Sequence, residues 1–275
     1  MSQLFTLPLT SKPGSVATPG AVVVTTPSPS VYLVTFQSEP DNRLTPALNS
    51  TLRLSLLIIR QRYPKGVVII TSAIAKFFSN GLDYESAMAD PTFFQSSLYP
   101  LWHTILTYPM PVVALMNGHA FAGGLLLALS CDYRIMNPHR GLTCLNELDL
   151  GAELRPGISV LLQQKLTSNK LLREVVLESK RYTGAQALEA GLVDGLGGLD
   201  EVLAFIEKKQ LLKKAASPVY GSIKEATFYR ETVLTLERED ADMVAHNARK
   251  EYLKKQSEAE EQEVNQLHIS QKAKL

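Results

Sequence analysis

The 275-residue chain has few cysteines, almost no net charge and no long apolar run. Its formal net charge of +1 produces no electrostatic field that would attract nucleic acid or an anionic membrane surface, so local groups must hold any anionic ligand. No apolar stretch approaches the roughly 20 residues that span a bilayer, and we therefore expect no membrane span. Hydrophobic residues make up 45% and charged residues 20% of the chain, which is typical of a folded protein and not of a disordered one.

The chain has two cysteines and five histidines, and neither set indicates a disulfide or a metal site. Cys131 and Cys144 both lie in apolar segments, so we expect buried free thiols in a reducing compartment. The histidines lack the close spacings of zinc ligands, which predicts that no metal is bound. His119 has no serine or cysteine partner in a nucleophile motif, and we expect it to make a structural polar contact.

Strand-like and helix-like segments alternate through most of the chain. Strands are expected at residues 31–36, 66–71, 112–116 and 132–136, and helices over 45–62 and from about 121. This rhythm predicts an α/β fold of repeated ββα units.

The two ends of the chain differ from this middle part in composition. Residues 1–30 include a stretch rich in Pro, Ser, Thr and Gly, which predicts an irregular N-terminal arm or edge strands instead of a helix. From about residue 219 the sequence becomes helical and highly charged. We therefore divide the chain into the arm over 1–30, a core with the ligand site over 31–212 and a helical region over 213–275.

The stretch from Pro111 to Gly151 reads as a strand, a Gly-rich turn that opens a helix, a second strand and an acidic loop. The turn at 122–124 would direct unpaired backbone N–H groups and the positive end of the helix dipole at one spot, which suits an oxyanion. Glu147 follows on the loop, where its carboxylate is a candidate general base beside that anion.

This stretch resembles the signature of the enoyl-CoA hydratase/isomerase (crotonase) superfamily. The resemblance rests on PVVA at 111–114, NG at 117–118, AGG at 122–124, CDYR at 131–134 and NELDLG at 146–151, with weaker features at 77–83 (FFSNGLD) and 182–194 (YTGAQALEAGLVD). It covers roughly residues 30 to 200 and implies a crotonase-type spiral of ββα units with a C-terminal helical layer. In this family such a layer packs on the core or on a neighbouring subunit, and the common assemblies are homotrimers and hexamers.

The resemblance also implies an acyl-CoA thioester as substrate, with no cofactor because coenzyme A is part of that substrate. A thioester carbonyl becomes an enolate when an α-proton leaves, and two converging N–H donors stabilise its oxygen. By resemblance these donors are the backbone amides of Leu82 and Gly123. The other residues implied to bind substrate are Asn80, Gly81, Asp83, Gly124, Leu126 and Lys76, although a solvated strand-end charge is an alternative role for Lys76.

Glu147 occupies the family's catalytic-glutamate position, and the adjoining Leu145, Leu148 and Leu150 would form an apolar wall that raises its pKa. Hydratases of the family carry a second glutamate three residues beyond the oxyanion glycine, where this sequence has Leu126. Hydration needs two carboxylates, whereas moving a double bond from C3 to C2 needs one base. The resemblance therefore favours a Δ3,Δ2-enoyl-CoA isomerase of fatty-acid β-oxidation or of a secondary pathway with the same chemistry.

Two alternatives stay open from the sequence. A hydratase or dienoyl-CoA isomerase would use Asp149 or Glu153 as its second acid, and an inactive crotonase-like subunit would only bind acyl-CoA or a partner. The last three residues, Ala273, Lys274 and Leu275, resemble a C-terminal peroxisomal address. We therefore expect recognition by a peroxisomal import receptor and a location in the peroxisome.

Overall fold

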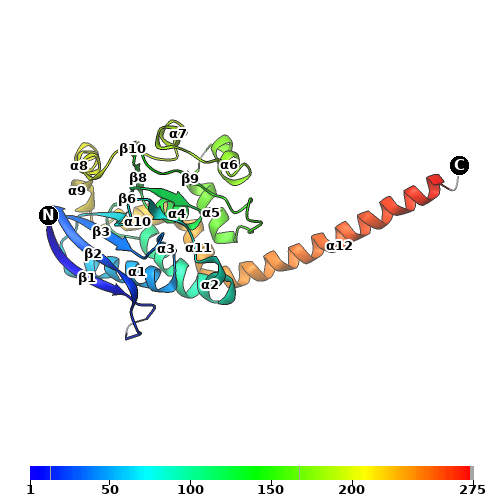
Figure 1. Ribbon diagram of the computed structural model, residues 1–275, viewed down its shortest axis with the longest axis horizontal. Helices are drawn as coiled ribbons and strands as arrows, with labels where there is room; N and C mark the ends of the chain where they lie inside the picture. Colours follow the sequence, from blue (N-terminus) through cyan, green and yellow to red (C-terminus); the bar gives the residue numbers. More distant parts are fainter. Residues whose placement is uncertain (13, 167, 273–275) are drawn as a thin grey trace.

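The computed structural model describes residues 1–12, 14–166 and 168–272, and these form a body with one long helix that extends away from it (Figure 1). In these ranges a seven-stranded sheet has the order β1-β2-β3-β4-β6-β8-β10, and a three-stranded sheet has the order β5-β7-β9. The strands are β1 (Ser2–Leu9), β2 (Thr18–Ser28), β3 (Val31–Gln37), β4 (Val67–Ser72), β5 (Phe77–Ser79), β6 (Val112–Met116), β7 (His119–Phe121), β8 (Tyr133–Met136), β9 (Thr143–Cys144) and β10 (Gly195–Leu196). The helices are α1 (Pro46–Arg62), α2 (Tyr84–Ala89), the π-helical η1 (Phe94–Leu98), α3 (Tyr99–Leu106), α4 (Gly123–Ser130), α5 (Pro156–Lys165), α6 (Asn169–Val176), α7 (Gly184–Glu189), α8 (Leu199–Lys208), α9 (Leu211–Ala215), α10 (Tyr220–Lys224), the π-helical η2 (Glu225–Tyr229), α11 (Arg230–Glu237) and α12 (Glu239–Lys272).

The predicted ββα repeat is confirmed, and its two strands belong to different sheets. The first strand of each repeat, β4, β6 or β8, lies in the large sheet, and the second, β5, β7 or β9, lies in the small one. Helices follow each pair, and neighbouring first strands run parallel. Each repeat therefore passes from a strand of the large sheet to a strand of the small sheet and then into a helix. The loops that follow the small-sheet strands come together at one edge of the small sheet.

Of the two structures predicted for residues 1–30, an irregular arm or edge strands, the structure has the strands. Most of this stretch forms β1 and β2, which pair antiparallel and extend the large sheet beyond β3. Val22 and Val24 are fully buried, so the strand contributes to the core. The prolines do not prevent pairing because the register shifts beside Pro8 in the outermost strand and around Pro27.

Helix α1 begins where the sequence predicts. Thr45 is its N-cap, its side-chain oxygen accepts a hydrogen bond from the Leu48 amide at 3.2 Å, and Pro46 occupies the first turn, where it loses no intrahelical hydrogen bond. The apolar residues at helical spacing, Leu48, Leu52, Leu56 and Ile59, are fully buried on one face.

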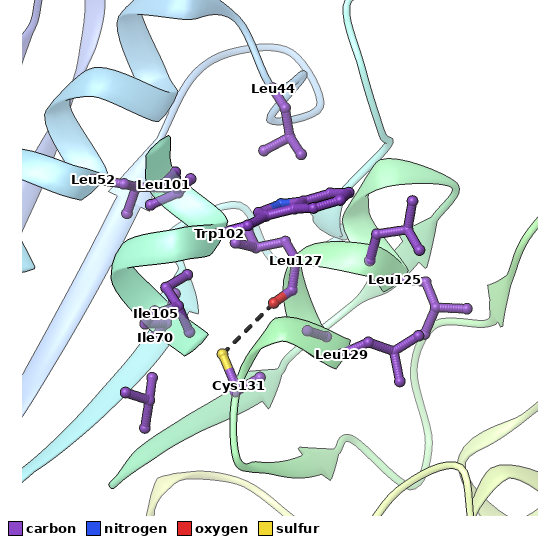
Figure 2. Close-up of a cluster of buried hydrophobic side chains, with 14 of the residues drawn as sticks. Leu44, Leu52, Ile70, Leu101, Trp102, Ile105, Leu125, Leu127, Leu129 and Cys131 are labelled. Atoms are coloured by element: carbon purple, nitrogen blue, oxygen red, sulfur yellow. Dashed lines mark hydrogen bonds between the residues drawn. The ribbon is translucent and has the colours of Figure 1, made fainter. Parts of the chain in front are cut away.

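The main hydrophobic core lies between the large sheet and helices α1, α3 and α4. Figure 2 shows Trp102 of α3 surrounded by aliphatic side chains from α1, α4 and the sheet, and Trp102 is fully buried. A smaller core on the opposite face of the sheet packs α8 and α9 through Val202, Ile206 and Leu211. Cys131 and Cys144 are buried and unpaired, as predicted.

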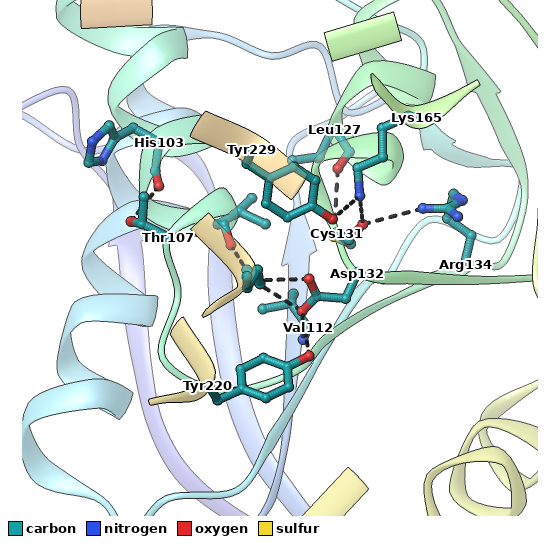
Figure 3. A network of polar contacts seen from close by, with 12 residues as sticks. His103, Thr107, Val112, Leu127, Cys131, Asp132, Arg134, Lys165, Tyr220 and Tyr229 are labelled. Atoms are coloured by element: carbon teal, nitrogen blue, oxygen red, sulfur yellow. Dashed lines mark hydrogen bonds and ion pairs between the residues drawn. The ribbon is translucent and has the colours of Figure 1, made fainter. Parts of the chain in front are cut away.

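The C-terminal helices α10 and η2 pack on the core through buried and half-buried polar groups, which include Tyr220 and Tyr229 (Figure 3). The Lys224 ammonium is 5% exposed, pairs with the Asp132 carboxylate at 3.1 Å and donates to the Ile105 carbonyl at 2.9 Å. Lys165 of α5 donates to the Cys131 carbonyl at 2.7 Å, and burial lowers its pKa to about 7. The predicted helical layer is therefore partly fused to the core, and the predicted boundary at residue 212 falls inside α9.

Helix α12 differs from the rest of that layer. Its first turns contact α5 and α11, and its remainder extends away from the body (Figure 1). None of the helices in the described ranges combines the length and apolar character needed to cross a bilayer. Ala273, Lys274 and Leu275, the predicted targeting tripeptide, lie outside the described residues.

Candidate active site

A cavity of about 690 Å³ opens where the Gly-rich turn, the loop after β5 and the loop after β9 meet the start of α12. The charged, amide and imidazole side chains of the lining belong to Arg43, Asn80, Asp90, Asn146, Glu147, Glu153, Arg155, His246, Asn247 and Lys250. Apolar lining groups come mainly from Leu82, Met88, Phe94, Phe121, Leu154 and Ile158. A cavity with one apolar wall and a few polar groups suits a ligand that has a fatty portion and a polar portion.

The Gly-rich turn is built on an unusual backbone conformation. Ala122 has a φ of +49°, a region that glycine favours and that costs other residues on the order of 1–3 kcal/mol. Its amide donates to the Cys144 carbonyl at 2.9 Å, and its carbonyl accepts from the Leu126 amide in the first turn of α4. These bonds hold the turn so that the Gly123 amide is the first of the helix and points out of its N-terminus.

The loop at Gly81 and Leu82 contributes the second candidate amide and lies directly against the Gly-rich turn. A Cβ added to Gly123 would lie 3.3 Å from the Leu82 nitrogen, and one added to Gly81 would lie 3.3 Å from the Gly123 nitrogen. Within the described ranges neither the Leu82 amide nor the Gly123 amide donates a hydrogen bond to another protein group. Two free amides so close together, one at the positive end of a helix, form a geometry that suits an oxyanion.

Two glycines make this approach possible. A Cβ on Gly124 would lie 2.3 Å from the Ser79 carbonyl oxygen, so no larger residue fits without moving β5 away from α4. Gly81 has a φ of +92°, which the loop needs in order to turn toward Gly123. Gly81 and Gly124 are predicted to bind substrate. In the structure they shape the backbone path, and neither is among the residues that line the cavity.

Glu147 lines the same cavity in a mostly desolvated position. Its Oε2 is buried and has no hydrogen-bond partner in the described part of the chain. Burial raises the pKa of the Glu147 carboxyl to about 7, although hydrogen bonds from the backbone amides of Glu147 and Asn146 oppose the increase. A carboxylate with this pKa can both accept and return a proton near neutral pH.

The predicted apolar wall beside Glu147 is only partly correct. Leu145 is buried, but Leu148 is 55% exposed and does not line the cavity, whereas Leu150 lines the cavity and is 64% exposed. The loop turns back on itself, with the Ala152 amide donating to the Glu147 carbonyl at 2.8 Å, so its leucines do not share one face. Desolvation of Glu147 therefore comes mainly from the rest of the cavity.

Three residues predicted to bind substrate lie away from the cavity. Leu126 is 2% exposed within the core, Asp83 precedes α2 and accepts from the Ser86 hydroxyl at 2.6 Å, and Lys76 lies over the Phe77 ring at 5.2 Å. Leu126 nevertheless occupies the motif position of the second glutamate of hydratases, so an aliphatic side chain stands there and not an acid.

Asn80, in contrast, does line the cavity, and its side-chain amide donates to the Asp41 carboxylate at 2.7 Å. His119 makes the predicted structural contact, because its Nδ1 accepts from the Leu142 amide at 3.0 Å. Burial lowers the pKa of His119. In the described ranges no group of three or more His, Cys, Asp and Glu side chains could hold a metal ion.

Helix α12 supplies a wall of the cavity that the sequence did not reveal. His246 and Lys250 face the cavity and contact Glu153, at 3.4 Å and 2.7 Å, and these contacts hold the pKa of the Glu153 carboxyl below its usual range. The sequence of α12 is so rich in charge that it indicates a solvated surface helix. No local pattern marks the turns of His246 and Lys250, which contact the loop of Glu153 nearly 100 residues earlier.

Arg155 and Glu239 form a buried ion pair behind this wall. Their Nε and Oε1 atoms lie 2.8 Å apart, Glu239 is 1% exposed, and the Tyr99 hydroxyl donates to the same carboxylate oxygen at 3.0 Å. The Arg155 guanidinium also stacks over the Phe94 ring at 4.0 Å. The start of α12 is thereby fixed to the end of the loop that carries Glu147.

Comparison with known proteins agrees with this geometry. A family model described as enoyl-CoA hydratase/isomerase matches residues 26–267. The protein called peroxisomal enoyl-CoA delta isomerase 2 of Arabidopsis thaliana is 31% identical over 212 residues, which cover 72% of this chain and 88% of that protein. Enoyl-CoA delta isomerase 3 of the same plant is 30% identical over 229 residues, covering 79% and 96% of the two chains.

The crystal structure of human mitochondrial delta3-delta2-enoyl-CoA isomerase matches with a TM-score of 0.70 at 25% identity, covering 80% of this chain and 88% of that one. The predicted crotonase fold is therefore confirmed. Since the family model matches most of the sequence and the relatives match over most of their length, the chain belongs to the enoyl-CoA hydratase/isomerase family.

Proposed function

We propose that this enzyme is a Δ3,Δ2-enoyl-CoA isomerase that uses a single base. The observation that carries the proposal is one mostly buried carboxylate, Glu147, with a pKa of about 7, in a cavity that is also lined by Leu82 and by Ala122, the residue before Gly123. The names of the two plant relatives and of the human structure support the same reaction. No cofactor is needed, because coenzyme A enters as part of the substrate.

In the proposed mechanism Glu147 removes a proton from C2 of a 3-enoyl-CoA thioester. The electron pair of the broken C–H bond passes into the carbonyl, and the negative oxygen of the resulting dienolate accepts hydrogen bonds from the Leu82 and Gly123 amides. Protonated Glu147 then returns the proton to C4. The double bond now lies between C2 and C3, conjugated with the thioester, and the enzyme regains its starting charge.

A second carboxylate would favour hydration or a dienoyl shift, and the candidates fit that role poorly. Leu126 is aliphatic and lies in the core. Glu153 is paired with Lys250 at 2.7 Å, and its lowered pKa makes it a poor proton donor at neutral pH. Asp149 is exposed and is absent from the cavity lining found in the described ranges. The single-base reaction is therefore the better-supported one.

The deciding experiment follows formation of the conjugated 2-enoyl thioester when purified protein meets 3-enoyl-CoA. Hydration of 2-enoyl-CoA is measured in parallel, with Glu147→Gln as the control variant. Isomerisation that disappears in the variant, with negligible hydration, supports the proposal. Substantial hydration would indicate a second acid, and inactivity in both assays would favour a binding role.

We further propose a location in the peroxisome, a part in fatty-acid β-oxidation and assembly as a homotrimer or hexamer. Support for the location comes from the tripeptide at residues 273–275 and from the name of one plant relative, although the human structure is mitochondrial. A fluorescent fusion is expected to be punctate and to become cytosolic when residues 273–275 are deleted. Unchanged puncta would contradict targeting by this tripeptide.

A further inference from the structure

The segment at residues 41–44 runs beside the segment at 79–82, which carries the Leu82 amide. An isolated parallel β-bridge joins Leu44 to Leu82, and three hydrogen bonds, including one of the bridge itself, tie the two segments together. These bonds are Asn80 N to Asp41 O (3.0 Å), Leu44 N to Gly81 O (2.8 Å) and Ser79 Oγ to Asn42 O (2.8 Å).

The peptide group that contains the Leu82 N–H is restrained on both sides. Its carbonyl, which belongs to Gly81, accepts from the Leu44 amide, and a bond to the carbonyl polarises the N–H of the same peptide. The next carbonyl, that of Leu82, accepts from Nη1 of Arg43 at 3.1 Å. Within the described ranges Arg43 is the only side chain that hydrogen-bonds to Leu82.

Arg43 is itself held in a fixed orientation. Its Nε pairs with the Asp41 carboxylate at 3.1 Å, and the same carboxylate oxygen accepts from the Asn80 side chain. The planar guanidinium therefore links an anion in one segment to a carbonyl in the other through two different nitrogens. A lysine ammonium is a point charge on a flexible stem and cannot maintain both contacts in one plane.

We propose that Arg43 is a positioning residue that sets the orientation of the Leu82 amide through this two-sided clamp. The inference rests on the proposed use of that amide as an oxyanion donor. A loop with a glycine at positive φ has no regular hydrogen-bond ladder to fix its peptides, so the clamp supplies that function. Donors aimed at a developing oxyanion lose much of their effect when they are misplaced by a fraction of an ångström to an ångström.

The Arg43 side chain is 44% exposed and lines the cavity, so its substitution leaves the core intact. The same exposure allows a different role, in which the cation binds the phosphates of coenzyme A. The two roles predict different kinetics. A positioning residue acts on kcat with any thioester, whereas a phosphate ligand acts on KM and only with substrates that carry the phosphates.

The kinetic test compares Arg43→Met and Arg43→Lys with Arg53→Met, a matched loss of one cation on the exposed face of α1. With 3-enoyl-CoA, Arg43→Met is expected to lower kcat about 10- to 100-fold with little change in KM, and Arg43→Lys to recover only a minor part. The same loss is expected with a 3-enoyl-pantetheine thioester, which lacks the nucleotide phosphates. Loss confined to KM, or absent with the pantetheine substrate, would overturn the proposal.

A spectroscopic test separates this inference from the proposed isomerase activity. A bound 2,4-dienoyl-CoA absorbs at longer wavelength when hydrogen bonds polarise its thioester carbonyl. This absorbance shift can be measured without catalytic turnover. Wild type and Arg53→Met are expected to give a red shift, and saturated Arg43→Met a smaller one. A wild-type shift in Arg43→Met, or no shift in the wild type, would overturn the positioning role whether or not the protein isomerises 3-enoyl-CoA.

Discussion

The two sides of the cavity are built by different means. On the proposed oxyanion side the candidate groups are backbone amides, held where Gly81, Gly123 and Gly124 let two chain segments meet without Cβ atoms between them. On the proposed base side the candidate group is one side chain on a loop, where Leu148 and Leu150 are exposed and Gly151 has open space around it.

This difference reflects what each group must do. An amide donor is useful only in the right place and direction, so its position must be fixed by close packing. A general base needs a suitable pKa and reach, and desolvation can provide the pKa even on a less tightly packed loop. The oxyanion side should therefore tolerate no added atoms, and the base side should tolerate backbone changes but not loss of its carboxylate.

The largest expected effect is that of Glu147→Gln. The amide has the shape of the carboxyl but cannot accept the C2 proton, so we expect kcat to fall by about 10³, within the range for removal of a general base. Steady-state isomerisation measures the change. Glu153→Gln serves as the comparison, and a loss of the same size in that variant would indicate that two acids act together.

The next largest effect is expected for an added methyl group, and it depends on the side. Gly124→Ala would place Cβ 2.3 Å from the Ser79 carbonyl oxygen and displace the Gly81–Leu82 loop, so we expect kcat/KM to fall by about 10² or more. Gly151→Ala meets no atom within 4 Å, and its φ of +64° costs about 1 kcal/mol of stability. Its kcat/KM is expected to stay within about tenfold of the wild type. Equal losses in the two variants would remove the contrast between the sides.

The sequence identified the oxyanion side better than the base side for the same physical reason. Where close contact between segments requires a glycine, that glycine is visible in the sequence. Gly123 and Gly124 can therefore be recognised from the sequence alone. The cavity that Glu147 lines is completed by α12, whose lining turns lie about 100 residues later and read locally as a charged surface helix. The orientation of Leu148 depends on how the loop folds back, which no period in the sequence encodes.

Local patterns predicted the elements of the fold well where they depend on periodicity and capping. The spacing of Leu48, Leu52 and Leu56 and the cap at Thr45 determine α1 without help from distant residues. For the N-terminal stretch the prolines left an irregular arm as open as edge strands, because long-range pairing with β3 decides the outcome. Leu126 shows the same limit, since its position in the motif predicted a substrate contact and its place on α4 puts it in the core.

A pH profile sharpens the contrast, because Glu147 has a pKa near neutrality whereas backbone amides do not titrate. The pKa of Glu147 is raised to about 7, and the carboxylate is the active form, so kcat/KM should rise with pH and level off above about pH 7. Below that value it should fall about tenfold for each pH unit. Rates of pre-equilibrated enzyme between pH 5 and 9 measure the curve, and a midpoint near 4.5 would mean that Glu147 is solvated.

The smallest expected effect on activity concerns the ties between the base loop and α12. Glu239→Gln leaves the Arg155 guanidinium without its buried counterion, which should cost about 3 kcal/mol of unfolding free energy while kcat falls only a few-fold. Glu153→Gln removes an exposed pair with Lys250, and we expect no measurable change in Tm. Thermal and urea unfolding of the two variants at pH 7 measure the difference. If both variants have the Tm of the wild type, the buried pair does not hold α12 on the loop. The position of α12 then depends on the packing of Met243 and its neighbours around the cavity.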